Sequence, residues 1–182
     1  MSIIKRFDLT GSVAVITGGG RGIGRGIALA YAEAGADVVL AARTLADVEA
    51  VAEEVRSLGR RALAIACDVT VDEQRSALIE QAREDMGAIT HLVNNAGGAG
   101  PNDPLTLSVE RFEEILRFNV SSAYHLCQLC VPHMRAAGTG NIINITSGAA
   151  RYAQTQFSAY GTAKAALSHM TRLLAQDFAP LV

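Results

Sequence analysis

Hydrophobic and polar positions follow two periods in turn along the chain, and this pattern predicts strands and helices in regular succession. Short apolar and β-branched runs indicate strands at residues 13–17, 37–41, 62–66, 90–94 and 141–146. Apolar residues at helical spacing indicate helices at residues 22–34, 45–58, 71–86, 108–137 and 158–179. Apolar strands separated by amphipathic helices imply a parallel sheet covered on both faces. We therefore predict an α/β fold, with a doubly wound and mostly parallel sheet, as a single domain over residues 1–182.

The turn between the first predicted strand and helix, residues 17–24, reads Thr-Gly-Gly-Gly-Arg-Gly-Ile-Gly. Glycines let the backbone approach a ligand closely, and the free N–H groups at the start of the following helix attract an anion. A glycine-rich turn is weak evidence by itself and much stronger at this place in an alternating α/β chain. We expect a Rossmann-like dinucleotide site here. The alternative is a turn whose glycines serve packing only.

The end of the second predicted strand indicates which dinucleotide is bound. About 20 residues past the glycines, an NAD site carries an acidic residue for the ribose hydroxyl, but residues 41–43 are Ala-Ala-Arg. Asp37 lies at the other end of the strand, and Asp47 falls inside the next helix. Arg43, assisted by Arg21, can meet a 2′-phosphate, so we predict NADP in preference to NAD. Alternatively, Arg43 is merely solvated and the site tolerates either cofactor.

Polar residues also follow the third and fourth predicted strands. Asp68-Val69 lies at the sheet edge where an adenine ring would bind, although Asp68 can equally act as a turn or helix cap. The segment 94–97, Asn-Asn-Ala-Gly, can be turn chemistry alone. Asn119 falls on the apolar stripe of the helix predicted over 108–137. A buried amide needs partners, so Asn119 is a candidate to hold a water or a kink near the site.

A hydroxyl, a phenol and an amine are brought together by the last predicted strand and helix. Ser147 lies at the carboxyl end of the strand, and we expect Ser158 to be the N-cap of the helix. Tyr160 and Lys164 are four residues apart and share one helix face. A free tyrosine has a pKa of about 10 and a nearby ammonium favours phenolate, so Tyr160 can exchange a proton with an alcohol or carbonyl while Ser147 holds the oxygen. From spacing alone, the alternative is a core-edge tyrosine and a solvated lysine.

The composition of the chain limits the classes of partner that we expect the protein to bind. The chain has 49% hydrophobic and 19% charged residues, which is typical of a globular protein. Its net charge of −2 gives no general attraction to nucleic acid or to an anionic membrane. No apolar run approaches the ~18 residues of a spanning helix, and residues 1–8 lack the apolar centre of a signal peptide. We expect a cytoplasmic protein with a small-molecule substrate.

The cysteines and histidines do not predict a disulfide framework or a metal centre. The chain has three cysteines, an odd number. His125, Cys127, Cys130 and His133 lie in one predicted continuous helix, which places the two histidines ~12 Å apart along its axis. That separation is too large for one tetrahedral zinc ion, so we expect no metal and favour small buried side chains.

Together and in order, these motifs resemble the short-chain dehydrogenase/reductase family, of the type usually called classical. The matching residues are Thr17-Gly18-x-x-x-Gly22-x-Gly24, Asn94-Asn95-Ala96-Gly97, Asn119, Ser147 and Tyr160-x-x-x-Lys164. The resemblance spans essentially the whole chain. Segments 94–101 and 158–169 look most similar to the branch that holds 7α-hydroxysteroid dehydrogenases. 3-Oxoacyl-carrier-protein reductases and glucose dehydrogenases are nearly as similar.

The resemblance implies a function and the residues that perform it. It implies an oxidoreductase that interconverts a secondary alcohol and a ketone, with a catalytic tetrad of Asn119, Ser147, Tyr160 and Lys164. In that tetrad Lys164 also binds the nicotinamide ribose, and Asn119 positions a water in a proton relay. The implied cofactor contacts are Gly18, Arg21, Gly22, Ile23, Gly24, Arg43, Asp68, Val69, Asn95, Ala96, Gly97, Tyr160 and Lys164. Residues 42–43 look like the NADP-preferring pattern, and members of the branch are commonly tetramers packed through the helices beginning near Ser108 and Ser158.

The chain departs from the family pattern at its end. It stops at Val182, after the fifth predicted helix, whereas family members continue into a sixth strand, a Pro-Gly turn, a substrate-covering segment and a seventh strand. We therefore expect a longer native chain, because a sheet ending at the fifth strand would expose an unpaired apolar edge. Two other functions stay open: a dinucleotide-binding sensor or scaffold without catalysis, and an epimerase or dehydratase of the same superfamily.

Overall fold

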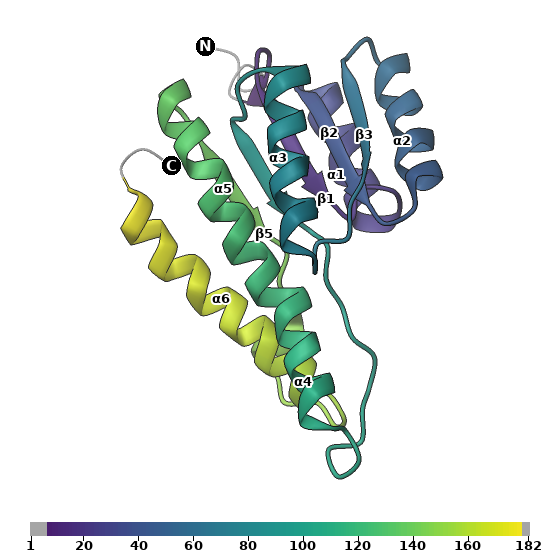
Figure 1. Ribbon diagram of the computed structural model, residues 1–182, viewed down its shortest axis with the longest axis vertical. Coiled ribbons are helices and arrows are strands. Elements are labelled where there is room, and N and C mark those ends of the chain that lie inside the picture. Colours follow the sequence, from purple (N-terminus) through teal and green to yellow (C-terminus); the bar gives the residue numbers. More distant parts are fainter. Residues whose placement is uncertain (1–6, 180–182) are drawn as a thin grey trace.

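The computed structural model describes residues 7–179, in which a five-stranded sheet lies between two layers of helices (Figure 1). Residues 1–6, in which we looked for a leader, and residues 180–182 at the chain end lie outside the described part. The strands are β1 Val13–Thr17, β2 Asp37–Ala42, β3 Ala62–Ala66, β4 His91–Asn94 and β5 Asn141–Asn144. The helices are α1 Gly22–Glu33, α2 Leu45–Ser57, α3 Asp72–Met86, α4 Val109–Leu116, α5 Ser122–Ala137 and α6 Ser158–Phe178.

All the strands run parallel, in the order β3-β2-β1-β4-β5. Val15 of β1 pairs with Val39 of β2 on one side and with Leu92 of β4 on the other. The chain crosses over between β3 and β4, so the strand order reverses next to β1. Open α/β sheets bind ligands at the carboxyl ends of the strands at such a switch point. The predicted doubly wound parallel sheet is confirmed.

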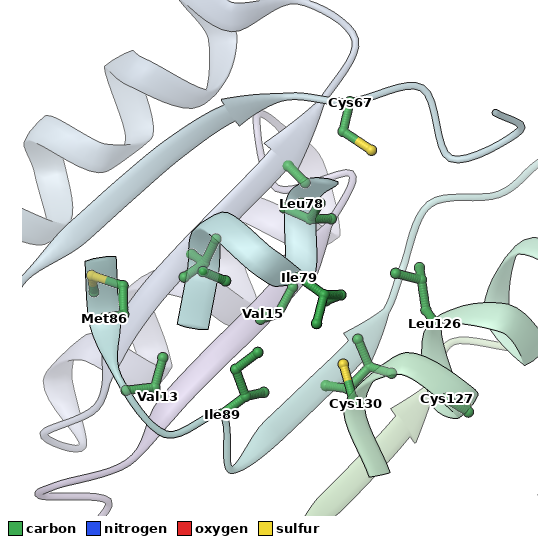
Figure 2. Packing of buried hydrophobic residues seen from close by; sticks show 14 of the residues in the cluster. Val13, Val15, Cys67, Leu78, Ile79, Met86, Ile89, Leu126, Cys127 and Cys130 are labelled. Carbon is green, nitrogen blue, oxygen red and sulfur yellow. The ribbon is translucent and has the colours of Figure 1, made fainter. Parts of the chain in front are cut away.

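Successive residues of the central strands point to opposite faces of the sheet, and this period of two produces two separate cores. Val13 and Val15 pack with α3 and α5, whereas Ala14 and Ile16 pack with α1 and α2. Figure 2 shows the first core, in which the labelled side chains of α3 and α5 meet those of β1. Burial on both faces explains why β1 is apolar up to its last residue, Thr17.

A third, smaller core positions the last helix. Ile115 of α4 packs with Ala159 and Ala163 of α6 near the carboxyl ends of the strands. These two alanines flank Tyr160 and precede Lys164 along α6. Their contact with Ile115 therefore fixes the position of both polar residues relative to the sheet. The small side chains allow α4 and α6 to approach closely where both helices begin (Figure 1).

Two local predictions are wrong. The helix predicted over residues 108–137 is not α-helical throughout, because a π-helical turn at Arg117–Ser121 separates α4 from α5. Ser158 is not the N-cap of α6 but its first helical residue. The N-cap is Phe157, whose carbonyl accepts the first helical hydrogen bond from Gly161 N–H at 2.7 Å. The turn before the helix therefore brings the chain into helical geometry one residue earlier than the hydroxyl pattern predicts.

The cysteines and histidines of α5 are engaged in packing and in polar contacts with neighbouring elements. Among residues 7–179, no group of three or more His, Cys, Asp or Glu side chains is placed to hold a metal ion. His125 accepts a hydrogen bond at Nδ1 from the Nε of Arg75 on α3, at 2.9 Å. Cys127 and Cys130 are buried free thiols, and burial raises the pKa of Cys127 to about 11. Within the same residues, no helix is long and apolar enough to span a bilayer.

Candidate active site

A cavity of about 920 Å³ lies at the carboxyl ends of the strands, across the switch point between β1 and β4. Most of the predicted cofactor contacts line it. They are Gly18, Arg21, Ile23, Arg43, Asp68, Val69, Asn95, Ala96, Gly97, Tyr160 and Lys164. Gly22 and Gly24 do not line the cavity, and neither do Asn119 and Ser147 of the predicted tetrad.

The cavity is also lined by residues that were not among the predicted cofactor contacts. They are Gly20, Ala41, Ala42, Thr44, Asp47, Cys67, Thr70, Gly98, Arg111, Glu114, Arg117, Phe118, Ile145 and Thr146. Asp47 was set aside because it falls inside a helix, but it lies in the first turn of α2, and that turn faces the cavity. Asp37 was correctly set aside, because it lies at the opposite end of β2 and pairs with Arg60 at 2.6 Å.

Gly24 shapes the site from behind the cavity. It is buried near the start of α1, where an added Cβ would lie 2.1 Å from the carbonyl oxygen of Gly18 and 2.7 Å from Nδ2 of Asn95. No side chain fits at that distance, so the glycine lets α1 pack directly on the turn that follows β1. The N-terminus of α1 therefore lies at the edge of the cavity. The first N–H groups of a helix have no partner within that helix and are free to meet an anion there.

We expect Gly24→Ala to lower the free energy of unfolding by at least about 2 kcal/mol, because the extra methyl must displace backbone. Gly26→Ala is the matched control, since Gly26 lies in the same helix and an added Cβ there meets nothing within 4 Å. Alanine is the better helix former, so this control should stabilise the protein by up to about 1 kcal/mol. Chemical denaturation of both variants measures the effect. Similar values for the two would contradict the packing role of Gly24.

Thr17 ties the glycine turn to the end of β4. Its hydroxyl accepts from Asn95 N–H at 3.1 Å and from Ala96 N–H at 3.0 Å. In return, the Asn95 side-chain amide donates to the carbonyls of Thr17 at 2.9 Å and of Gly18 at 3.1 Å. The sequence motifs gave Thr17 no role of its own. Its signal was a hydroxyl at the end of a fully buried strand, which requires partners.

Asp68 organises a turn and also lines the cavity. Its Oδ1 accepts from the N–H of Thr70 at 2.9 Å and from the Thr70 hydroxyl at 2.7 Å, so it organises the turn after β3. The Thr70 N–H holds the pKa of Asp68 below its usual range, and the charge of Arg43 acts in the same direction. The carboxylate also lines the cavity. The ionised carboxylate is therefore favoured close to Arg43 at this end of the site.

Lys164 is buried although it carries a charge. Only 4% of the residue is exposed, and its Nζ donates to the main-chain carbonyl of Ile145 at 2.9 Å. The same nitrogen lies 5.8 Å from the centroid of the Tyr160 ring, so the spacing of four residues does place both groups on one face of α6. Burial lowers the pKa of Lys164 below its usual range. An amine held this close to a phenol at the cavity wall is placed to act on its proton.

Asn119 lies in the π-helical turn and holds the loop after β4. It is 1% exposed, its Oδ1 accepts from Gly98 N–H at 2.8 Å, and its Nδ2 donates to the carbonyls of Gly98 and Ile115. An added Cβ at Gly97 would lie 2.7 Å from Asn119 Oδ1 and 2.9 Å from Lys164 Nζ. Gly97 is therefore the point where the loop, the π-helical turn and α6 come together. The expectation that Asn119 marks a kink agrees with this geometry.

Ser147 lies three residues beyond the end of β5, because the strand ends at Asn144 instead of continuing to residue 146. Its hydroxyl accepts a hydrogen bond from Ala149 N–H at 3.2 Å and so caps a short 3-10 turn, Gly148–Ala150. Just after the strand, Ile145 N–H still donates to the Asn94 carbonyl of β4 at 3.0 Å. This last link keeps the segment that carries Ser147 close to the switch point.

Comparison with known proteins identifies relatives that span nearly the whole chain. An uncharacterized oxidoreductase of Mycobacterium tuberculosis (strain CDC 1551 / Oshkosh) is 48% identical over 181 residues, which are 99% of this chain and 69% of that protein. The 7α-hydroxysteroid dehydrogenase of Escherichia coli K12 is 41% identical over 169 residues, which are 93% of this chain and 66% of that protein. The chain thus spans about two thirds of the length of these relatives.

A solved structure has the same arrangement of elements. A 7α-hydroxysteroid dehydrogenase in complex with NADH and 7-oxo glycochenodeoxycholic acid superposes with a TM-score of 0.94 at 39% identity, covering 98% of this chain and 69% of that one. The profile of the short chain dehydrogenase family matches residues 12–181. The match covers both the glycine turn and the Tyr160–Lys164 pair, and on this ground the chain belongs to the short-chain dehydrogenase family.

Proposed function

We propose that the protein is an NADP(H)-dependent oxidoreductase that interconverts a secondary alcohol and a ketone. The observation that carries the proposal is the placement of Lys164, a buried ammonium 5.8 Å from the Tyr160 ring in the wall of the large cavity. Burying a charge is costly, and buried ionisable groups in cavity walls are concentrated at functional sites. A proton-transfer role for the neighbouring phenol accounts for it.

The residues around the cavity fit a nicotinamide dinucleotide. The N-terminus of α1 and the turn before it provide N–H groups for a pyrophosphate, and Gly24 allows that approach. Asp68 and Val69 line the end where an adenine would lie, and Lys164 lines the end beside Tyr160. When bound, the nicotinamide supplies a hydride acceptor or donor.

In this proposal the side chains of the chain handle the proton and the oxygen. During alcohol oxidation Tyr160 takes the hydroxyl proton, and during ketone reduction it returns a proton to the oxygen. Lys164 favours the ionised phenol, and Ser147 donates a hydrogen bond to the reacting oxygen and orients it. Asn119 supports the proton relay by holding the loop of Gly97 and Gly98 against Lys164.

The preference for NADP rests on Arg43 and Arg21, both of which line the cavity. We expect Arg43→Ala to weaken NADPH binding about 10- to 100-fold, the value of one or two charge-assisted hydrogen bonds. Binding of NADH should change by less than about 3-fold, because it lacks the 2′-phosphate. Cofactor titration by fluorescence measures both. Arg83→Ala, an exposed arginine on α3 away from the cavity, should alter neither affinity.

Two other results of that titration would count against NADP specificity. An equal loss of affinity for NADPH and NADH would mean that Arg43 contacts a part of the cofactor that both molecules share. No loss for either would mean that Arg43 is merely solvated. The solved relative that holds NADH makes dual use of NAD and NADP the competing outcome.

The substrate class is tested by measuring NADPH oxidation over hydroxysteroid precursors, simple ketones and 3-oxoacyl thioesters, with the native full-length protein. A relative named 7α-hydroxysteroid dehydrogenase makes steroid ketones the first choice. Turnover on at least one class supports the proposal. Cofactor binding without turnover on any class would instead favour a dinucleotide-binding sensor or scaffold, and regeneration of the cofactor in each cycle would favour an epimerase or dehydratase.

We also include a homotetramer and a cytoplasmic location in the proposal. The cytoplasmic location is the expectation drawn from the sequence composition, and the homotetramer rests on the resemblance of the sequence to its branch of the family. Exposed apolar side chains on the helices expected to pack between subunits agree with it: Val109 of α4, Tyr124 of α5 and Leu173 of α6. Sedimentation analysis of the native full-length protein measures the assembly.

A further inference from the structure

Lys164 is held at both ends by two consecutive residues of the segment that leaves β5. Its ammonium nitrogen donates to the main-chain carbonyl of Ile145 at 2.9 Å. Its own main-chain carbonyl is within hydrogen-bond distance of the Thr146 hydroxyl, at 3.2 Å. The two contacts come from adjacent residues, so the lysine spans a short gap between α6 and the sheet and is tied down on both sides of it.

A second hydroxyl completes the contact at the main-chain end. Ser168, one turn further along α6, donates to the Lys164 carbonyl at 2.8 Å and lies 2.7 Å from the Thr146 hydroxyl. The oxygen atoms of the Thr146 hydroxyl, the Ser168 hydroxyl and the Lys164 carbonyl thus lie within hydrogen-bond distance of one another, and they share the two hydroxyl protons. A serine in a helix can satisfy its hydroxyl through this carbonyl alone. The additional contact with Thr146 adds a further link between the helix and the segment that leaves β5.

The connection couples Lys164 to Ser147, because Thr146 directly precedes Ser147 in the chain. We propose that Thr146 and Ser168 are positioning residues that keep the Lys164 ammonium at a set distance from Tyr160 and from the Ser147 hydroxyl. This inference rests on the proposed function, in which Tyr160 and Ser147 act on the substrate oxygen and Lys164 favours the ionised form of Tyr160. Small displacements of such groups are costly, since a shift of about 1 Å can lower a rate about 100-fold.

A neighbouring pair makes the same kind of link without touching Lys164. The Asn144 side chain donates to the Thr171 hydroxyl at 2.9 Å, and that hydroxyl donates to the Leu167 carbonyl at 2.8 Å. Strand residue, helix hydroxyl and helix carbonyl are arranged as in the Thr146–Ser168 pair. Leu167 is a buried core residue that does not line the cavity. Thr171 therefore provides a matched control for a bond that only attaches α6 to the sheet.

The test uses Ser168→Ala and Thr146→Val in the native full-length protein. We expect kcat to fall about 10-fold in each, while KM for the alcohol changes by less than about 2-fold, because positioning and not substrate binding is impaired. The midpoint of unfolding of Ser168→Ala should stay near that of the wild type, since alanine is the better helix former. Ser168→Thr keeps the hydroxyl and should restore kcat to within about 2-fold of the wild type.

Three kinetic results would overturn the inference: wild-type kcat in Ser168→Ala, an equal fall of kcat in Thr171→Ala, or no recovery in Ser168→Thr. If the wild type itself turns over no substrate, the proposed function fails, and the inference is decided by a measurement without turnover. That measurement is the rate at which acetic anhydride acetylates Lys164, followed by peptide mass spectrometry. Release of the lysine should raise the rate about 10-fold in Ser168→Ala and leave it unchanged in Thr171→Ala. An unchanged rate in Ser168→Ala would refute the positioning role.

Discussion

Replacing Tyr160 by phenylalanine is expected to lower kcat by about 10³- to 10⁴-fold, the upper part of the range for losing a general acid–base group. The substitution removes only the phenolic oxygen. The ring can keep its edge contact with Phe157, at a centroid separation of 6.1 Å, and its place beside Lys164. NADPH affinity should therefore stay within about 3-fold of the wild type, so that chemistry is lost while cofactor binding is kept.

Steady-state kinetics on the best substrate of the panel, together with cofactor titration, measures both parts of this prediction. Tyr152→Phe is the matched control, since Tyr152 lies in the segment before α6, is 75% exposed and does not line the cavity. The control should keep full turnover. Undiminished turnover in Tyr160→Phe would remove the proposed proton-transfer role, whereas loss of NADPH binding would assign the hydroxyl to the cofactor instead.

Gly97→Ala should have the second largest effect, because it places a methyl group between two members of the proposed tetrad. The new Cβ would lie 2.7 Å from Asn119 Oδ1 and 2.9 Å from Lys164 Nζ, and both atoms must move. Both are ends of side chains, so the protein can adjust at a cost of about 1–3 kcal/mol in the free energy of unfolding. The catalytic geometry tolerates less, and we expect kcat to fall about 100-fold.

The control for this substitution lies in the same loop. Gly100 has open space around an added Cβ, so Gly100→Ala should leave both stability and turnover close to the wild type. Kinetics and chemical denaturation of the two variants separate loss of geometry from loss of folding. Should Gly97→Ala retain wild-type kcat, the close approach of the loop to Asn119 and Lys164 would have no part in catalysis.

Much of the fold and part of the site could be predicted from the spacing of residues within short segments. Strands β1 to β3 and the helices between them could be predicted because apolar residues recur with the period of a strand or of a helix, two or 3.6 residues. The glycine turn sits where an α/β chain binds phosphate because it lies between the first strand and the first helix. Tyr160 and Lys164 share a face because they are four residues apart in one helix.

Contacts between distant segments were beyond the reach of the same reasoning. The π-helical turn at Asn119 depends on Gly98, 21 residues away, whose N–H and carbonyl both bond to the Asn119 side chain. The helix period alone therefore predicts an unbroken α-helix there. The N-cap of α6 differs for a local reason, because the Phe157 N–H contacts the carbonyl of Gln154 in the turn before the helix and the helix begins one residue earlier than the hydroxyl of Ser158 suggests.

The sequence by itself determined the order of the elements, the glycine turn and the helix face shared by Tyr160 and Lys164, because each depends on neighbours within a few residues. The parallel sheet followed from the alternation of apolar strands with helices along the whole chain. Only the tertiary structure decided that Asp47 faces the cavity, that Thr17 joins the glycine turn to Asn95, and that Lys164 is buried against the Ile145 carbonyl. These contacts join residues brought together by packing of the sheet and its helices. Burial and hydrogen-bond partners at such places are properties of the assembled fold, and a linear spacing does not encode them locally.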